Sequence, residues 1–237
     1  RLTGPNNQQA GYLFSIANLE ILGPGLLGLA RHGGINFHDG PLPRYAGIHA
    51  TSWALMAGES QHGVTWHRIG EKVDEGAILV QRAIPIEPGE TTYSLNTKCL
   101  QTGLETFVEL IALLEGDAIK DTPQTPAQRS YFGKFQRPEG EGFLDWTRPA
   151  TELTALVRTL DFGPHPNRLA AAKMLLPDGR VCLVTGAAPG PEPAPVSLSS
   201  PGLILTANEQ YLEVAAGNGS VRLTQLKALS GELFPPA

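Results

Sequence analysis

The sequence predicts an α/β domain with a doubly wound, mostly parallel sheet, followed by a small C-terminal β-barrel. Apolar strand-like runs alternate with helix-like stretches in the first half of the chain. A segment rich in Pro, Gln, Thr and charge follows, and short apolar stretches separated by Gly and Pro come after it. We therefore expect a first domain over residues 1–120, a linker over 121–142 and a barrel domain over 143–237.

The first elements form a strand, helix and strand. Residues 12–18 are a nearly continuous apolar run, which is typical of a strand covered on both faces. Residues 22–31 are predicted to contain a helix, with Pro24 near its start and Gly33 after its end. A short strand is expected at 34–37.

The remaining elements follow from the same periodicities. The first half is completed by a helix at 50–59, strands at 63–69 and 77–86, and a long helix at 91–115. The second half is predicted to contain an amphipathic helix at 149–160, short strands at 173–176, 180–184, 202–206, 211–215 and 221–226, and a Pro-rich loop at 187–201.

Composition excludes several classes of protein. The chain has 237 residues, 41% hydrophobic and 17% charged, and no apolar run approaches the roughly 20 residues that span a bilayer, so no membrane partner is expected. The net charge of −5 disfavours a nucleic acid partner. Cys99 and Cys182 lie among apolar neighbours and are interpreted as buried reduced thiols, which predicts a cytoplasmic protein.

The most unusual segment is the polar loop that begins in the strand at 34–37. Side chains alternate along a strand, so Asn36 and His38 point to the same side, near the edge where open α/β sheets bind ligands. An amide donor beside an imidazole suits a developing oxyanion and a proton transfer. Pro41 and Pro43 make the loop stiff, and Leu42–Pro43 is a candidate cis peptide. An isolated Asn-X-His pair is, however, more often structural than catalytic.

A second polar segment lies at 70–76, a turn between two predicted strands that contains Asp74. This turn brings a carboxylate to the same sheet edge, although an isolated Asp in a turn is most often a surface residue. His62 and His67 are five residues apart on a predicted strand and so lie on opposite faces, which argues against a metal pair. We predict no metal site.

Together these segments resemble a known family. Residues 36–47, Asn-Phe-His-Asp-Gly-Pro-Leu-Pro-Arg-Tyr-Ala-Gly, with Gly63-Val-Thr and Val73-Asp-Glu-Gly, are similar to the formyltransferases that use 10-formyltetrahydrofolate. Phe143-Leu-Asp-Trp and the helix after it resemble the start of the C-terminal barrel in the tRNA-type members. The resemblance implies a Rossmann-like catalytic domain and an OB-like barrel.

The resemblance also implies a site. The catalytic Asn, His and Asp of the family match Asn36, His38 and Asp74. The amide and the imidazole would stabilise the oxyanion, and the carboxylate would accept the proton of the attacking amine. The folate of the co-substrate, 10-formyltetrahydrofolate, is expected against the two segments that hold Phe14, Leu19, Leu22, Lys72 and Val73.

The chain departs from the family pattern at its beginning. The strand-helix units that normally precede the strand at 12–18 are absent, so the sheet is expected to be partial and completed by a homodimer or by a longer multidomain chain. The expected acceptor is an amine of secondary metabolism, either a small molecule or an aminoacyl group on a carrier protein of a nonribosomal peptide synthetase. Methionyl-tRNA formylation, hydrolysis of formyltetrahydrofolate and an inactive scaffold domain stay open as alternatives.

Overall fold

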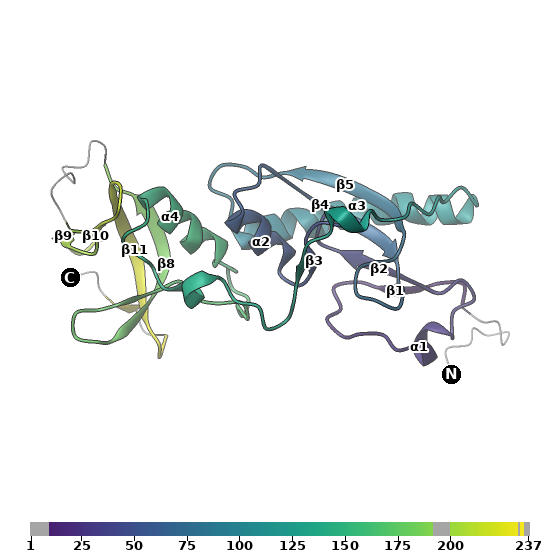
Figure 1. The fold of residues 1–237 in the computed structure, drawn as a ribbon, viewed down its shortest axis with the longest axis horizontal. Coiled ribbons are helices and arrows are strands. Elements are labelled where there is room, and N and C mark those ends of the chain that lie inside the picture. Colours follow the sequence, from purple (N-terminus) through teal and green to yellow (C-terminus); the bar gives the residue numbers. More distant parts are fainter. Residues whose placement is uncertain (1–9, 192–199, 232, 235–237) are drawn as a thin grey trace. The chain divides into compact units, whose positions relative to one another are not determined.

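The computed structural model describes residues 10–191, 200–231 and 233–234. The chain divides into two compact units (Figure 1). Unit 1 contains residues 1–54, 59–86 and 95–134, and unit 2 contains residues 55–58, 87–94 and 135–237. Each unit is described by itself.

A four-stranded sheet is the centre of unit 1. Its strands are β1 (Leu13–Ser15), β2 (Gly34–His38), β4 (Gln61–Arg68) and β5 (Ile78–Pro85), in the order β1-β2-β4-β5. The α/β class is confirmed, but the pairing is mixed: β1 pairs with β2 in parallel, whereas β2 with β4 and β4 with β5 are antiparallel. The loop between β4 and β5 contains no helix, and without a crossover β5 must return antiparallel.

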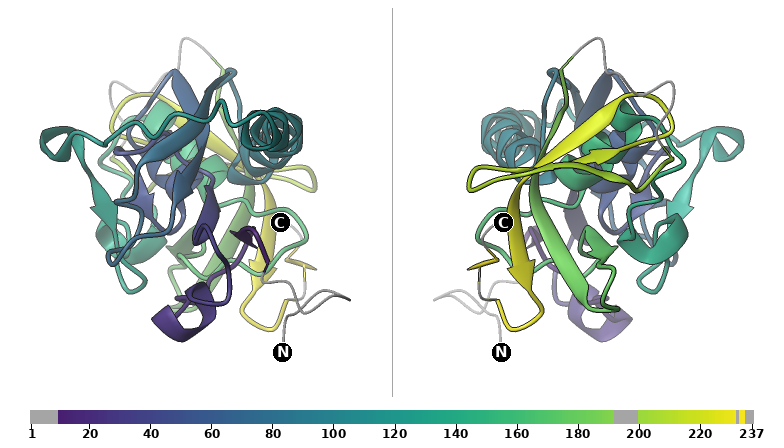
Figure 2. Two further views of the ribbon diagram at one scale, coloured as in Figure 1. Left: turned by 90° about the vertical axis from the view of Figure 1, so that its right-hand side faces the viewer. Right: turned by 90° about the vertical axis from the view of Figure 1, so that its left-hand side faces the viewer.

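Helix α3 (Thr92–Glu115) covers one face of this sheet, as the left view of Figure 2 shows. The Phe37 and Trp66 rings lie on that face with centroids 5.0 Å apart, and Trp66 Nε1 donates a 2.9 Å hydrogen bond to Thr106 Oγ1 of the helix. A Cβ on Gly103 would lie 2.6 Å from the Phe37 ring, so this close approach requires glycine. Alternation along β2 leaves the opposite face for Asn36 and His38.

The other elements of unit 1 are short. They are α1 (Pro24–Leu27), α2 (Ala50–Met56), and β3 (Ala46–Gly47), which pairs in parallel with β6 (Tyr131–Phe132). Helix α1 is much shorter than the stretch predicted at 22–31, because Gly25 and Gly28 oppose helix propagation. The Leu42–Pro43 peptide is cis, as predicted.

The described part of unit 2 contains an antiparallel sheet, an α-helix and a short 3-10 helix, η2 (Glu139–Gly142). Helix α4 (Ala150–Thr159) buries the side chains of Leu153 and Val157. The strands of the sheet lie in the order β7-β8-β11-β10-β9, and β12 pairs with β11. The strands are β7 (Lys173–Leu175), β8 (Val181–Pro189), β9 (Ile204–Ala207), β10 (Leu212–Ala215), β11 (Ser220–Ala228) and β12 (Leu233–Phe234).

This sheet is curled into a half-barrel, which agrees with the small barrel that the sequence predicted, and within the described residues its strands follow an open path (Figure 2, right view). The register of β8 against β11 shifts on both sides of Gln225. Such irregularities bend a strand and increase its twist. The predicted barrel-type fold of the C-terminal half is thus confirmed, while most of the loop predicted at 187–201 lies outside the described residues.

Both cysteines, Cys99 and Cys182, are buried, as the sequence predicted. Among the helices of the described segments, none combines the length and the apolar character needed to cross a bilayer.

Candidate active site

The polar face of the unit 1 sheet brings the three predicted catalytic side chains together. Asn36 and His38 lie on β2, opposite α3, and the register of β2 with β4 places His67 beside Asn36. His38 Nδ1 lies 3.6 Å from Asp74 Oδ2, and His67 Nε2 lies 3.3 Å from Asp74 Oδ1. Asn36 Nδ2 is 3.2 Å from His67 Nε2, so the four polar side chains form one connected cluster.

Asp74 reaches this cluster by a route that differs from the expected one. Because β4 runs antiparallel to β2, the end of β4 lies beside the start of β2 and not at its carboxyl edge. The β4–β5 connection carries Asp74 onto the polar face, above His67 and His38. The prediction that Asp74 reaches the site at the carboxyl edge of β2 is therefore wrong. The predicted convergence of Asp74 with Asn36 and His38 is found.

The Asp74 carboxylate is buried between two imidazoles and one amide. Its Oδ2 accepts a 2.8 Å hydrogen bond from the Gly47 backbone N–H. Burial by itself would raise the pKa of Asp74, but the hydrogen bond with His67, the charge of His38 and the Gly47 amide together hold that pKa below its ordinary value of 3.8. The carboxylate is therefore ionised near neutral pH.

The hydrogen bonds of His38 decide which of its nitrogens faces the carboxylate. Nε2 lies 2.8 Å from the Tyr45 carbonyl oxygen, which can only accept, so Nε2 carries the proton. In the neutral ring Nδ1 is then an unprotonated base directed at Asp74. Gly40 leaves room for this ring, since a Cβ there would lie 2.6 Å from His38 Nε2.

His67 is a site residue that the sequence analysis missed. Its Nδ1 lies 2.8 Å from the Arg68 carbonyl oxygen and must donate to it, so Nε2 of the neutral ring accepts from the Asn36 amide. When His67 is protonated, Nε2–H can donate to Asp74 instead. Its proximity to Asn36 follows from strand register, which could have been found only if the β2–β4 pairing had been recognised.

Hydrogen bonds with residues of β4 and β5 hold the loop that follows β2. The Leu42 N–H donates to Thr65 Oγ1 at 3.2 Å, and the Thr65 hydroxyl donates to the Gly40 carbonyl at 2.7 Å. Gln81 Nε2 donates to the Leu42 carbonyl at 2.8 Å. These bonds connect the loop to β4 and β5, so the predicted stiffness comes from the sheet as well as from the prolines.

His62 lies apart from His67 and supports the same loop. Its Nε2 donates a 2.7 Å hydrogen bond to the Asp39 carbonyl oxygen. Burial lowers the pKa of His62, so the ring is neutral in the folded protein. Within the described part of the chain, no set of three or more His, Cys, Asp or Glu side chains is arranged to hold a metal ion.

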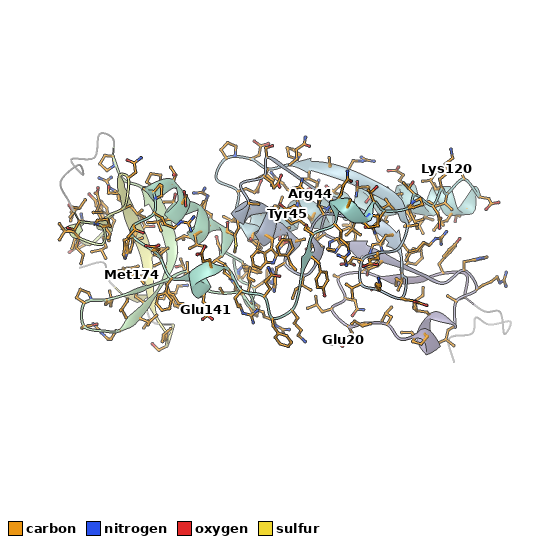
Figure 3. The ribbon with its side chains drawn as sticks, in the orientation of Figure 1. Glu20, Arg44, Tyr45, Lys120, Glu141 and Met174 are labelled. Carbon is orange, nitrogen blue, oxygen red and sulfur yellow. The ribbon has the colours of Figure 1, made fainter. Side chains whose placement is uncertain are left out.

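An aromatic and charged group follows the loop. Arg44 and Tyr45, labelled in Figure 3, both bond to Glu59, and the guanidinium lies 5.2 Å from the Tyr45 ring centroid. Burial, followed by the hydrogen bond with Glu59, raises the pKa of Tyr45 to about 12. Tyr45 also stacks on Phe132, with ring centroids 5.7 Å apart. The backbone that carries the Tyr45 carbonyl is thereby fixed.

The residues predicted to contact folate are distributed over both faces of the sheet. Phe14 packs edge-on against Phe107 of α3, on the face opposite the cluster, because it pairs in register with Ile35 and not with Asn36. Phe14 therefore lies partly buried on the α3 side of the sheet. Leu19 is 73% exposed and Leu22 is partly buried in the segment after β1. Lys72 and Val73, which precede Asp74 directly, are both exposed.

Comparison with protein families assigns the two halves of the chain to one family. The family described as "Formyl transferase" matches residues 7–111, and "Formyl transferase, C-terminal domain" matches residues 138–235. The chain belongs to the formyl transferase family.

Three known proteins show different degrees of similarity to this chain. A methionyl-tRNA formyltransferase from Anaeromyxobacter dehalogenans is 34% identical over 212 residues, which are 90% of this chain and 65% of that protein. The structure of HypX from Aquifex aeolicus in complex with tetrahydrofolic acid has a TM-score of 0.68 at 21% identity, over 96% of this chain and 38% of that one. The structure of an N-formyltransferase from Helicobacter canadensis, solved with folinic acid and dTDP-3-aminofucose, has a TM-score of 0.61 at 17% identity. The match covers 89% of this chain and 72% of that one.

Proposed function

We propose that this protein transfers a formyl group from 10-formyltetrahydrofolate to a primary amine. The observation that carries the proposal is the convergence of Asn36, His38 and Asp74 on one buried polar face. Family membership supports the same chemistry. An amide donor, an imidazole and an ionised carboxylate are the groups that an acyl transfer to an amine requires.

Each side chain has a distinct role in the proposed reaction. The amine nitrogen forms a bond to the formyl carbon, and the bond from that carbon to the folate nitrogen breaks. Asn36 donates a hydrogen bond to the formyl oxygen as it gains negative charge, and His38 can donate one only from Nδ1, once that nitrogen has taken up a proton. The proton that the amine loses passes to the pair of Asp74 and His38, which returns it to the folate nitrogen as that nitrogen leaves.

In this mechanism His67 sets the orientation of the Asn36 amide. Neutral His67 offers Nε2 as an acceptor, and this turns the NH2 group of Asn36 toward it. One N–H of that group is then engaged with His67, and the second is available to the formyl oxygen. A protonated His67 bonds to Asp74 instead and leaves the amide without this partner.

The folate portion is proposed to lie along the segment after β1 and the turn before Asp74. Leu19 and Val73 supply exposed apolar surface there, Leu22 is partly buried, and Lys72 supplies a cation. Exposed apolar side chains beside a polar cluster are typical of a binding site for a planar ring. HypX and the Helicobacter enzyme were each solved with a folate compound, which supports folate as the class of ligand but not its position.

The proposed acceptor is an amino acid amine in secondary metabolism, free or attached to a peptide-synthetase carrier protein, and the reaction is proposed to be cytoplasmic. The net charge of −5 disfavours a long polyanion as acceptor. Methionyl-tRNA is the second candidate, because a methionyl-tRNA formyltransferase is 34% identical to this chain. Binding of tRNA that weakens steeply with salt would favour the second candidate.

The experiment is a transfer assay with 10-formyltetrahydrofolate and a panel of free amines, amino sugars, carrier-bound aminoacyl groups and methionyl-tRNA, followed by the mass of the formylated product. Formyl transfer to one amine class, abolished in His38→Ala, is the expected result. Release of formate without any amine would identify a hydrolase. Turnover by neither route, or an unchanged rate in His38→Ala, would contradict the proposal.

We also propose that more of a longer polypeptide covers the outer side of unit 1. Three apolar side chains of α3, Leu100, Leu104 and Val108, lie exposed at helical spacing, and in the described sheet β1 pairs with β2 alone. The chain spans only 65% of its methionyl-tRNA formyltransferase relative, which leaves room for a further strand-helix layer. Light scattering checks this: a dimer of the 237-residue chain would instead identify a second copy as the cover.

A further inference from the structure

The segment at 121–132 is fastened to unit 1, although its composition is typical of a linker. Thr122 and Ile78 exchange two backbone hydrogen bonds, of 2.8 and 2.9 Å. Ten residues further on, β6 pairs with β3. Between these two attachments the segment contacts the turn that carries Asp74 and the loop that carries Tyr45.

Gln124 bonds directly to the Asp74 turn. Its Nε2 donates to the carbonyl oxygens of Asp74, at 2.8 Å, and Gly76, at 2.7 Å. Both amide protons are thus used, while the buried Oε1 has no partner among the described residues. Two carbonyls can only accept, so they fix the orientation of the Gln124 amide.

The turn needs such support because its backbone is strained. Asp74 has a φ of +56°, in the left-handed region that costs a residue with a side chain about 1 kcal/mol. At Gly76 a Cβ would lie 1.8 Å from the Arg68 carbonyl oxygen, so the turn is also pressed against the end of β4. A strained backbone of this kind persists only where several surrounding contacts hold it in place.

Arg129 holds the other side of the same turn. Its Nη2 donates to the Val73 carbonyl oxygen at 2.9 Å, and its Nε donates to Glu75 Oε1 at 3.2 Å. The guanidinium lies 5.0 Å from the centroid of the Tyr131 ring. Gln124 and Arg129 together bond four successive residues of the turn, Val73 to Gly76.

The same segment also positions the partners of Asp74 and His38. Ser130 Oγ accepts the Tyr45 N–H at 2.8 Å, and the Ser130 carbonyl accepts the Ala46 N–H at 3.0 Å. These bonds fix the backbone between the Tyr45 carbonyl, which binds His38, and the Gly47 N–H, which binds Asp74. One segment therefore connects both loops of the site.

We propose that Gln124 is a positioning residue for the formyl transfer: it holds the Asp74 turn so that the carboxylate lies between His38 and His67. This inference rests on the proposed function. Gln124 acts through the backbone of the turn, and Asp74 is the group placed next to the reacting atoms.

The test compares Gln124→Glu with Gln128→Glu, which makes the same change at an exposed position of the same segment. In Gln124→Glu, the carboxylate faces two carbonyl oxygens that have lost their donor. We expect kcat to fall roughly 10- to 100-fold, the effect of a small misplacement of a catalytic group, while the KM for 10-formyltetrahydrofolate changes little. Gln124→Met, which removes the donor without adding charge, should reproduce the loss.

Hydrogen exchange is a second measurement, and it tests the position of Asp74 without an activity assay. The Gly47 amide donates to Asp74 Oδ2, whereas the Ile48 amide donates to the Phe132 carbonyl. Hydrogen exchange at Gly47 should accelerate in both Gln124 variants, with Ile48 unchanged as evidence that β6 is still in place. Exchange at Gly47 and kcat that both match Gln128→Glu would overturn the inference. An inactive wild type would contradict the proposed function, and the Gly47 exchange would still test the positioning.

Discussion

Asp74 in unit 1 and Glu213 in unit 2 are both buried carboxylates, and the two are held in different ways. Glu213 lies on β10, where the Ser220 hydroxyl donates to its Oε1 at 2.6 Å and Arg222 Nε donates to its Oε2 at 3.0 Å. Asp74 lies in a connection with a positive φ, between two imidazoles and one backbone amide. The first carboxylate is part of a regular sheet, and the second is part of a strained turn.

The difference teaches what each carboxylate can do. A guanidinium is always protonated, so Arg222 fixes a negative charge on Glu213 and no proton can be exchanged between them. An imidazole nitrogen can either accept or donate a proton, so a proton can move within the group of His38, His67 and Asp74. Glu213 is therefore held for structure, whereas Asp74 is the carboxylate for which we propose a role in proton transfer.

The largest effect that would sharpen this contrast is on catalysis. Asp74→Asn should lower kcat for formyl transfer by roughly 100- to 10,000-fold, because a general acid-base group contributes about that much. Glu213→Gln should change kcat less than about twofold, as an ordinary surface or structural change does. Steady-state kinetics of the two variants test this, and equal losses would break the distinction between the carboxylates.

The next largest effect is on stability, where we expect the larger loss at Glu213 and the smaller one at Asp74. Arg222→Met leaves buried Glu213 without its cation and should reduce the free energy of unfolding by about 1–3 kcal/mol, less than for a fully buried pair because Arg222 is partly exposed. Asp74→Asn should cost less than about 1 kcal/mol, since Asn tolerates a positive φ. Urea unfolding measures both; a larger loss for Asp74→Asn would contradict the assignment.

A third effect is the loss of stability in acid. Burial alone would raise both pKa values. The hydrogen bond with His67 for Asp74, and those with Ser220 and Arg222 for Glu213, outweigh burial and lower them below 3.8 and 4.5. The stabilisation is therefore complete above these ordinary values and is lost as pH falls through the lowered values of the folded state. The urea midpoint should drop less between pH 5 and about 3 in Glu213→Gln and in Asp74→Asn than in wild type.

The smallest effect belongs to a surface ion pair. Arg82 and Glu109 form a 2.7 Å pair in which both side chains are about half exposed. Removing it with Arg82→Gln should change the free energy of unfolding by less than about 0.5 kcal/mol, because solvent screens such a pair. The same urea titration in 0.5 M salt serves as a control, since salt should reduce even this difference. A loss of stability as large as that of Arg222→Met would show that side-chain exposure does not predict how much an ion pair contributes to the stability of this protein.

Local patterns were sufficient to predict most elements of the chain. The periodicity of α3 and α4 and the apolar runs of β2, β4 and β5 predicted those elements to within a few residues. Asn36 and His38 were found together because alternation along one strand is a local property. Helix α1 is shorter than the stretch predicted at 22–31, because Pro24 favours a helix start but the glycines that follow it oppose propagation.

The sequence by itself determined the element types, the two halves of the chain and the three side chains of the proposed catalytic group. Tertiary structure alone decided that β2 and β4 are antiparallel, that His67 joins Asn36, and that Gln124 supports the turn of Asp74. These contacts join residues 31 and 50 positions apart. Periodicity reports only which face a residue occupies on its own element, whereas strand register and the path of a connection depend on how the whole sheet is packed.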